Sequence, residues 1–137
     1  MTRPPTASPA KILIADDDAK TRAFLHDALK SLPVMIVEAE NGIEAMTMVE
    51  QVKPALVITD YQMPPWDGLE VCRQIRQQPG LKDIKMLMVT GEAVDRELLH
   101  AVNFGLVDAA LSKPVTLIEI QRLVRHLLGI GASPPGA

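Results

Sequence analysis

The chain has 137 residues, which fits one ordinary domain with a buried core and is short for two. Hydrophobic residues make up 47% of it and charged residues 23%, a composition that excludes a disordered or collagen-like chain. The formal net charge is -3 with acidic and basic residues interspersed, so we expect no direct contact with nucleic acid or with an anionic membrane surface.

The first nine residues are rich in proline and small residues, which predicts a flexible tail. They lack the apolar stretch of a signal peptide, and no run in the chain approaches the roughly 18 apolar residues of a membrane span. The single cysteine, Cys72, cannot form an internal disulfide and is typical of a reducing compartment. We therefore expect a cytoplasmic protein that does not cross a membrane.

From residue 10 to residue 128, short apolar runs alternate with longer stretches in which apolar residues recur at helical spacing. The predicted strands are residues 11–15, 35–39, 56–59, 86–89 and 109–111. The predicted helices are residues 19–31, 43–52, 68–78, 95–104 and 116–128. This βαβα order, with right-handed crossovers, predicts one doubly wound α/β domain over residues 10–128. Residues 129–137 are predicted to be a second flexible tail or the start of a linker.

Two further features concern helix ends and core filling. Asp67 precedes a helical pattern with Glu70 three positions later, which predicts an acidic variant of a capping box. Because aromatic residues are only 3% of the chain, aliphatic side chains and methionines must fill the core. The methionines expected there are Met35, Met46, Met48, Met86 and Met88.

Side chains that could bind a ligand or take part in catalysis lie where the predicted strands end. Asp16 and Asp17 follow the first strand, and Asp60 follows the third. Thr90 ends the fourth strand, and the fifth leads into Lys113. Ligands of doubly wound sheets bind outside the C-terminal strand ends, so these side chains are expected to lie at one binding edge.

Carboxylates a few ångström apart cannot all stay ionised without a compensating cation, and Mg²⁺ suits two or three carboxylates plus phosphate oxygens. Asp60 is the best candidate nucleophile for a phosphoryl group, while Lys113 and Thr90 could stabilise the developing charge. Each residue also has a simpler interpretation. Asp18 is predicted to be a helix N-cap, Thr90 alone is an unremarkable strand end, and Lys113 alone would be solvated.

These residues, with the Met63-Pro64 and Asp67-Gly68 pairs that follow Asp60, resemble the receiver domain of two-component response regulators over nearly all of residues 10–128. The resemblance implies a flavodoxin-like fold with strand order 2-1-3-4-5. It also implies a signalling protein that catalyses its own phosphorylation and its own dephosphorylation without being a turnover enzyme. Its expected partners are a histidine kinase or phosphotransfer protein as donor and an unknown protein target.

The resemblance assigns a role to each site residue. Asp60 would be the phosphoacceptor. Asp17 and Asp60 would bind Mg²⁺ directly, Asp16 would act mainly through a metal-bound water, and the backbone carbonyl of Gln62 would supply another ligand. Thr90 would hydrogen-bond the phosphoryl group. Lys113 would pair with the same group, and its bond to Pro114 would be cis. Gln62 and Glu92 would flank the site and tune the access of water.

The chain departs from the family pattern in two places. Ala110 stands where an aromatic switch residue is usual, three positions before the lysine, and Gly105 is one residue farther from Lys113 than usual. We therefore expect phosphorylation to reach a partner through backbone movement and the fourth helix, or through a substitute side chain such as Phe104.

Two alternatives remain open on the sequence. A pseudo-receiver binding module would keep the fold without phosphorylation. A haloacid dehalogenase-type phosphatase would use Asp16 as its nucleophile and Asp18 as the second acid. The site of phosphorylation distinguishes the phosphatase from the receiver. The receiver hypothesis predicts phosphate on Asp60, and the phosphatase hypothesis predicts it on Asp16.

Overall fold

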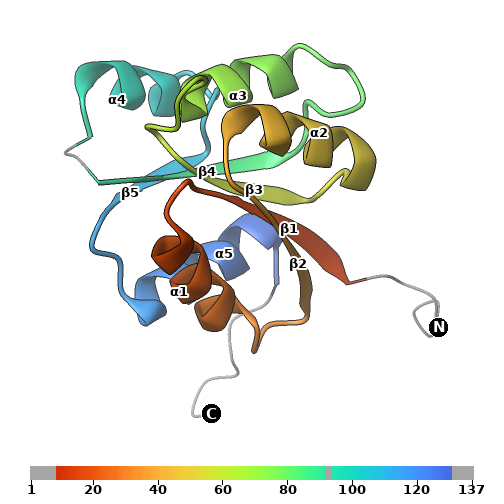
Figure 1. The fold of residues 1–137 in the computed structure, drawn as a ribbon, viewed down its shortest axis with the longest axis vertical. Coiled ribbons are helices and arrows are strands. Elements are labelled where there is room, and N and C mark those ends of the chain that lie inside the picture. The colour runs from red at the N-terminus through yellow and green to blue at the C-terminus, as the bar shows by residue number, and fades with distance from the viewer. Residues whose placement is uncertain (1–8, 92–93, 131–137) are drawn as a thin grey trace.

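The structure, a computed structural model, describes residues 9–91 and 94–130. Five parallel strands form one sheet in the order β2-β1-β3-β4-β5 (Figure 1). The strands are β1 (Ala10–Ala15), β2 (Val34–Ala39), β3 (Leu56–Asp60), β4 (Lys85–Thr90) and β5 (Ala109–Ser112). The helices are α1 (Ala19–Leu29), α2 (Gly42–Val52), α3 (Gly68–Arg76), α4 (Arg96–Asn103) and α5 (Leu117–Leu128). The predicted doubly wound, flavodoxin-like fold is confirmed, and every element end lies within two residues of its predicted position. Most of the two predicted tails, and Glu92, lie outside the described residues.

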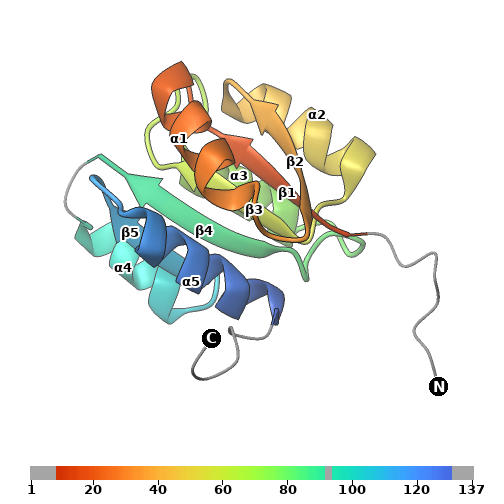
Figure 2. The ribbon, with the colours of Figure 1, turned by 90° about the horizontal axis from the view of Figure 1, so that it is seen from below.

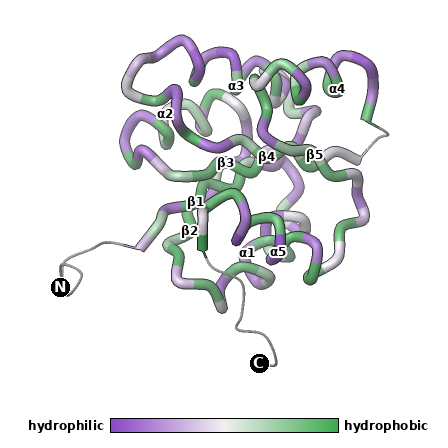
Figure 3. Tube along the Cα trace, turned by 180° about the vertical axis from the view of Figure 1, so that it is seen from behind, coloured by the Kyte–Doolittle hydropathy of each residue, from purple (hydrophilic) through white to green (hydrophobic). Residues whose placement is uncertain are grey.

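The sheet is covered on both faces. Helices α1 and α5 lie on one face and α2, α3 and α4 on the other (Figures 1 and 2). Successive residues of a strand point to opposite faces, so Leu13 and Val57 join one buried cluster while Ile12 and Ile58 join the second. Hydrophobic residues follow the central strands and hydrophilic ones mark the outer helices (Figure 3). Within the described ranges, no helix has the length and apolar character needed to cross a bilayer.

Helix starts are fixed by polar side chains that accept backbone N–H bonds. The N-caps are Asp18, Asn41, Asp67, Asp95 and Thr116. The predicted capping box at α3 is only half formed: Asp67 accepts from the Glu70 N–H, but the Glu70 side chain pairs with the next turn of its own helix. A two-way capping box occurs instead at α5, between Thr116 and Glu119.

The methionine prediction is right except at one position. Met46, Met86 and Met88 are buried, and Met48 packs against the core. Met35 is 51% exposed because β2 is an edge strand with one neighbour. The pattern of apolar residues predicts a strand but does not show whether that strand lies at the edge of the sheet, so the exposure of Met35 could not be predicted.

The start of α3 lies directly against the end of β3. The Gly68 N–H donates to the Tyr61 carbonyl over 2.8 Å. A Cβ atom at Gly68 would collide with the Asp60 carbonyl oxygen and lie 2.6 Å from the Met88 sulfur. Glycine is therefore required for this approach, which fixes the loop that follows Asp60.

Candidate functional site

Three carboxylates converge at the C-terminal edge of the sheet. Asp16 and Asp17 follow β1, and Asp60 ends the neighbouring strand β3. One carboxylate oxygen from each of the three residues lies within 4.8 Å of the other two. The side chains of Asp16 and Asp60 are 2% and 12% exposed, whereas Asp17 faces solvent. The cluster is thus anchored in the protein and open on one side.

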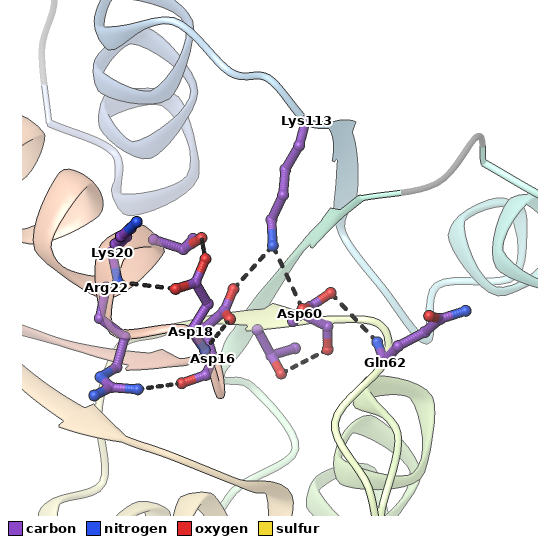
Figure 4. A network of polar contacts seen from close by, with 9 residues as sticks. Asp16, Asp18, Lys20, Arg22, Asp60, Gln62 and Lys113 are labelled. Atoms are coloured by element: carbon purple, nitrogen blue, oxygen red, sulfur yellow. Dashed lines mark hydrogen bonds and ion pairs between the residues drawn. The ribbon is translucent and has the colours of Figure 1, made fainter.

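Lys113, which directly follows the edge strand β5, brings a positive charge to this cluster. Its Nζ lies 3.1 Å from Asp16 Oδ2 and 3.4 Å from Asp60 Oδ2 (Figure 4). Its backbone N–H donates to the Thr90 carbonyl over 2.7 Å, which ties the residue after β5 to the end of β4. The peptide bond between Lys113 and Pro114 is cis, as predicted.

The electrostatic balance differs between Asp16 and Lys113, the two partners of the shortest ion pair in this cluster. Burial raises the pKa of Asp16, and the nearby Asp60 charge adds to this, while the Asp18 N–H bond and Lys113 only partly oppose it. Burial acts to lower the pKa of Lys113, but its bonds and charge pairing with Asp16 and Asp60 outweigh burial and raise that pKa. The ammonium therefore stays charged, while the charge of the buried Asp16 carboxylate is incompletely compensated.

This set of donors fits a hard divalent cation. Carboxylate oxygens alone make up the cluster, and Mg²⁺ prefers oxygen ligands and keeps several waters. The incomplete compensation of Asp16 gives an electrostatic reason for a further positive charge. Gln62 lies beside the cluster, since its N–H donates to Asp60 Oδ1 over 3.3 Å. The residues present therefore fit a magnesium ion.

The structure brings the predicted site residues to one edge. Thr90 is fully buried at the end of β4, one residue beyond Val89, which pairs with Asp60. Asp18 serves as the predicted N-cap, accepting from the Lys20 N–H and the Thr21 hydroxyl. The six residues at this edge are Asp16, Asp17, Asp60, Gln62, Thr90 and Lys113.

Arg22 also belongs to this environment, and the sequence interpretation missed it. Its Nη1 donates to the backbone carbonyl of Asp16 over 2.6 Å (Figure 4). Its Nε bonds Glu38 over 3.2 Å and its Nη2 lies 3.6 Å from Glu40, both at the end of β2. The guanidinium thus holds the start of the acidic loop against α1 and β2. A basic residue one turn into the helix after the acidic triplet was the available signal.

Replacing Arg22 with glutamine is expected to weaken Mg²⁺ binding about tenfold, because groups that orient metal ligands typically contribute that much to affinity. Isothermal titration with Mg²⁺ would measure the change. Arg73→Gln is the control, since the ion pair of Arg73 within the described residues is with the half-buried Glu70 on its own helix. Equal affinity in folded Arg22→Gln and wild-type protein would contradict this positioning role.

Asp16→Asn is expected to stabilise the metal-free protein at pH 7 and to weaken its response to Mg²⁺. The folded-state pKa of Asp16 lies above its unfolded value, so the folded protein binds more protons between the two. Wild-type stability in EDTA should therefore fall as the pH rises through this window, then level off. The asparagine variant should lose that fall in thermal unfolding curves. The Asp18→Asn control, which keeps the N-cap, should retain it.

Comparison with known proteins agrees with the fold and with an acidic pocket. The family model of the response regulator receiver domain matches residues 12–125, so the chain belongs to that family. Receiver domains act in two-component signalling, bind Mg²⁺ at an acidic pocket, and are signalling proteins rather than turnover enzymes. The phosphatase alternative based on Asp16 is therefore wrong.

The chain is similar to response regulator MprA of Mycobacterium sp. strain KMS, with 34% identity over 88% of this chain and 51% of MprA. It thus spans about half the length of that relative. A 14.6 kDa protein from the sodA1 3′ region of Leptolyngbya boryana is 32% identical over 88% of this chain and 92% of its own length. The fold is also similar to the crystal structure of response regulator TrrA from Thermotoga maritima, in complex with Mg²⁺ and BeF, whose sequence is 32% identical to this chain. It has a TM-score of 0.76 and covers 87% of this chain and 99% of TrrA.

Proposed function

We propose that the chain is a phosphoacceptor receiver in which Asp60 takes a phosphoryl group in a Mg²⁺-dependent reaction. The observation that carries this proposal is the Lys113 ammonium between the carboxylates of Asp16 and Asp60, within a three-carboxylate cluster. Asp17, Asp60 and the Gln62 backbone carbonyl would hold the ion directly, and Asp16 would bind one of its waters. The bound ion would supply positive charge next to the phosphoryl oxygens.

In the transfer step, an oxygen of the Asp60 carboxylate forms a bond to phosphorus. The bond from phosphorus to the donor's leaving group breaks, and the leaving group departs with the electron pair. Lys113 already contacts Asp60 and is held charged, so it can move its hydrogen bond to a phosphoryl oxygen without a proton transfer. Thr90, buried at the end of β4, would donate its hydroxyl to the same group. Hydrolysis of the resulting acyl phosphate would return the free carboxylate.

The family points to a histidine kinase or a phosphotransfer protein as donor, and to a protein that binds the two states differently as target. A cytoplasmic location and the absence of direct nucleic-acid binding remain part of this proposal. The Mg²⁺ and BeF bound by TrrA support the choice of metal and of a phosphoryl ligand.

The remaining alternative is a pseudo-receiver that binds a partner without phosphorylation. The protein should be incubated with acetyl phosphate and Mg²⁺, and its intact mass followed with time. An adduct that forms only with Mg²⁺, disappears with EDTA present and is cleaved by hydroxylamine would support an aspartyl phosphate. If no adduct forms while Mg²⁺ binds normally, the pseudo-receiver is the better account.

A further inference from the structure

The residue after the acceptor is hydrogen-bonded to the start of α4. The Tyr61 hydroxyl lies 3.2 Å from Asp95 Oδ2 and 3.3 Å from Glu97 Oε1. Asp95 is the N-cap of α4, and its Oδ1 accepts the Leu98 N–H over 2.8 Å. A side chain adjacent to Asp60 in the sequence therefore contacts the carboxylate that begins a helix more than 30 residues later.

Tyr61 is also held firmly on the side of the acceptor. Its carbonyl accepts the Gly68 N–H, and its ring packs against the same buried cluster as Ala110. On either side of Tyr61 stand Asp60 and Gln62, which are linked by the bond from the Gln62 N–H to Asp60 Oδ1. A phosphoryl group or a metal bound through Oδ1 of Asp60 would compete with the Gln62 N–H for that oxygen. The backbone that carries Tyr61 is thus part of the segment that the proposed chemistry perturbs.

The contact with α4 depends on a single hydrogen. A tyrosine hydroxyl has one proton to donate, and two carboxylates lie within reach of it. A tyrosine hydroxyl is protonated at neutral pH, so it can donate to either carboxylate. A small displacement of Tyr61 changes which of the two carboxylates it satisfies, and one of them caps the helix.

We propose that Tyr61 transmits the state of Asp60 to α4, in place of the aromatic residue that the chain lacks at position 110. This inference rests on the proposed phosphorylation of Asp60. Perturbation of the segment from Asp60 to Gln62 alters the hydroxyl contacts of Tyr61. The N-terminus of α4 then responds through Asp95.

The test uses amide NMR spectra of the full chain with the substitution Tyr61→Phe, which keeps the ring and removes the hydroxyl. Thr47→Val is the matched control, because it removes an exposed hydroxyl that bonds the backbone of a different helix, α2. In the free proteins, amide exchange at Leu98 and Leu99 should be roughly fivefold faster in Tyr61→Phe and unchanged in Thr47→Val.

The same proteins are then given Mg²⁺ and beryllofluoride, a phosphoryl analogue. Wild type and Thr47→Val should show shifts both at Asp60 and Lys113 and in the first turn of α4. Tyr61→Phe should keep the shifts at Asp60 and Lys113 and lose most of those in α4. Equal α4 shifts in Tyr61→Phe, or unchanged exchange in the free protein, would overturn the role of Tyr61. If the amide signals of Asp60 and Lys113 do not shift in any of the proteins, the proposed phosphorylation is overturned, and this inference with it.

Discussion

Replacement of Asp60 by asparagine is expected to slow the acetyl phosphate reaction by at least about 1,000-fold, because the nucleophile of a covalent step is removed. Asparagine has nearly the shape of aspartate and can still accept the Gln62 N–H bond. The fold should therefore persist while the chemistry stops. Intact mass, recorded over time with saturating Mg²⁺, measures the rate of adduct formation.

The control for this substitution is Asp67→Asn. Asp67 lies in the same loop and caps α3, a role that asparagine fills equally well. The Asp67 variant should form the adduct at close to the wild-type rate. Comparable rates in Asp60→Asn and wild type would remove Asp60 from the reaction, even if an adduct were present.

Lys113→Met should slow adduct formation about 100-fold, because a charged donor to the transferring phosphoryl group is lost. The same change leaves the buried Asp16 carboxylate without its cation. Breaking a buried ion pair is costly, but Lys113 is 25% exposed, so we expect a loss of only about 1–3 kcal/mol in metal-free unfolding free energy at pH 7. Urea titration in EDTA measures this loss, and Mg²⁺ should restore part of it by supplying another positive charge.

Lys20→Met serves as the matched control for Lys113→Met. Lys20 lies nearby on α1, and the pocket between α1 and the segment after β5 is lined by both lysines. Its side chain is exposed, whereas the ion pairs of the Asp16 and Asp60 carboxylates within the described residues are made by Lys113. An equal slowing of the reaction in both variants would indicate a general effect of positive charge and contradict a specific role for Lys113.

The sequence was sufficient to place the candidate site residues together because of the geometry of parallel sheets. Each strand was recognisable from its apolar run, and the C-terminal ends of parallel strands lie at one edge. Asp16, Asp60 and Lys113 could therefore be placed together although almost 100 residues separate the first from the last.

Contacts that depend on helix orientation could not be predicted in the same way. Arg22 reaches back to the Asp16 carbonyl, and Tyr61 reaches across to Asp95, only because α1 and α4 pack at particular positions on the sheet. Exposure of Met35 likewise depends on the position of β2 at the sheet edge. These features follow from tertiary packing, which neither residue spacing nor local propensity specifies.

The structure also shows the surroundings of Ala110, which stands where the family usually has an aromatic residue. Ala110 pairs with Met88 across β4 and β5 and is partly buried against the cluster that Tyr61 also contacts. Gly105, with a φ of 82°, follows the end of α4 in a conformation that favours glycine. The chain thus keeps an aromatic residue on this face of the sheet, but it comes from the segment after the acceptor strand.

The most direct test of the central claim is to locate the phosphoryl group on the wild-type protein. After reaction with acetyl phosphate and Mg²⁺, borohydride reduction would convert a phosphorylated aspartate to homoserine, which survives digestion. Trypsin separates Asp16, Asp17 and Asp18 in the peptide 12–20 from Asp60 in the peptide 31–73, since cleavage does not occur between Lys53 and Pro54. Fragment ions should place homoserine at Asp60 alone, and only when Mg²⁺ was present. Homoserine at Asp16, or its absence from both peptides despite bound Mg²⁺, would contradict the assignment of Asp60 as the phosphoacceptor.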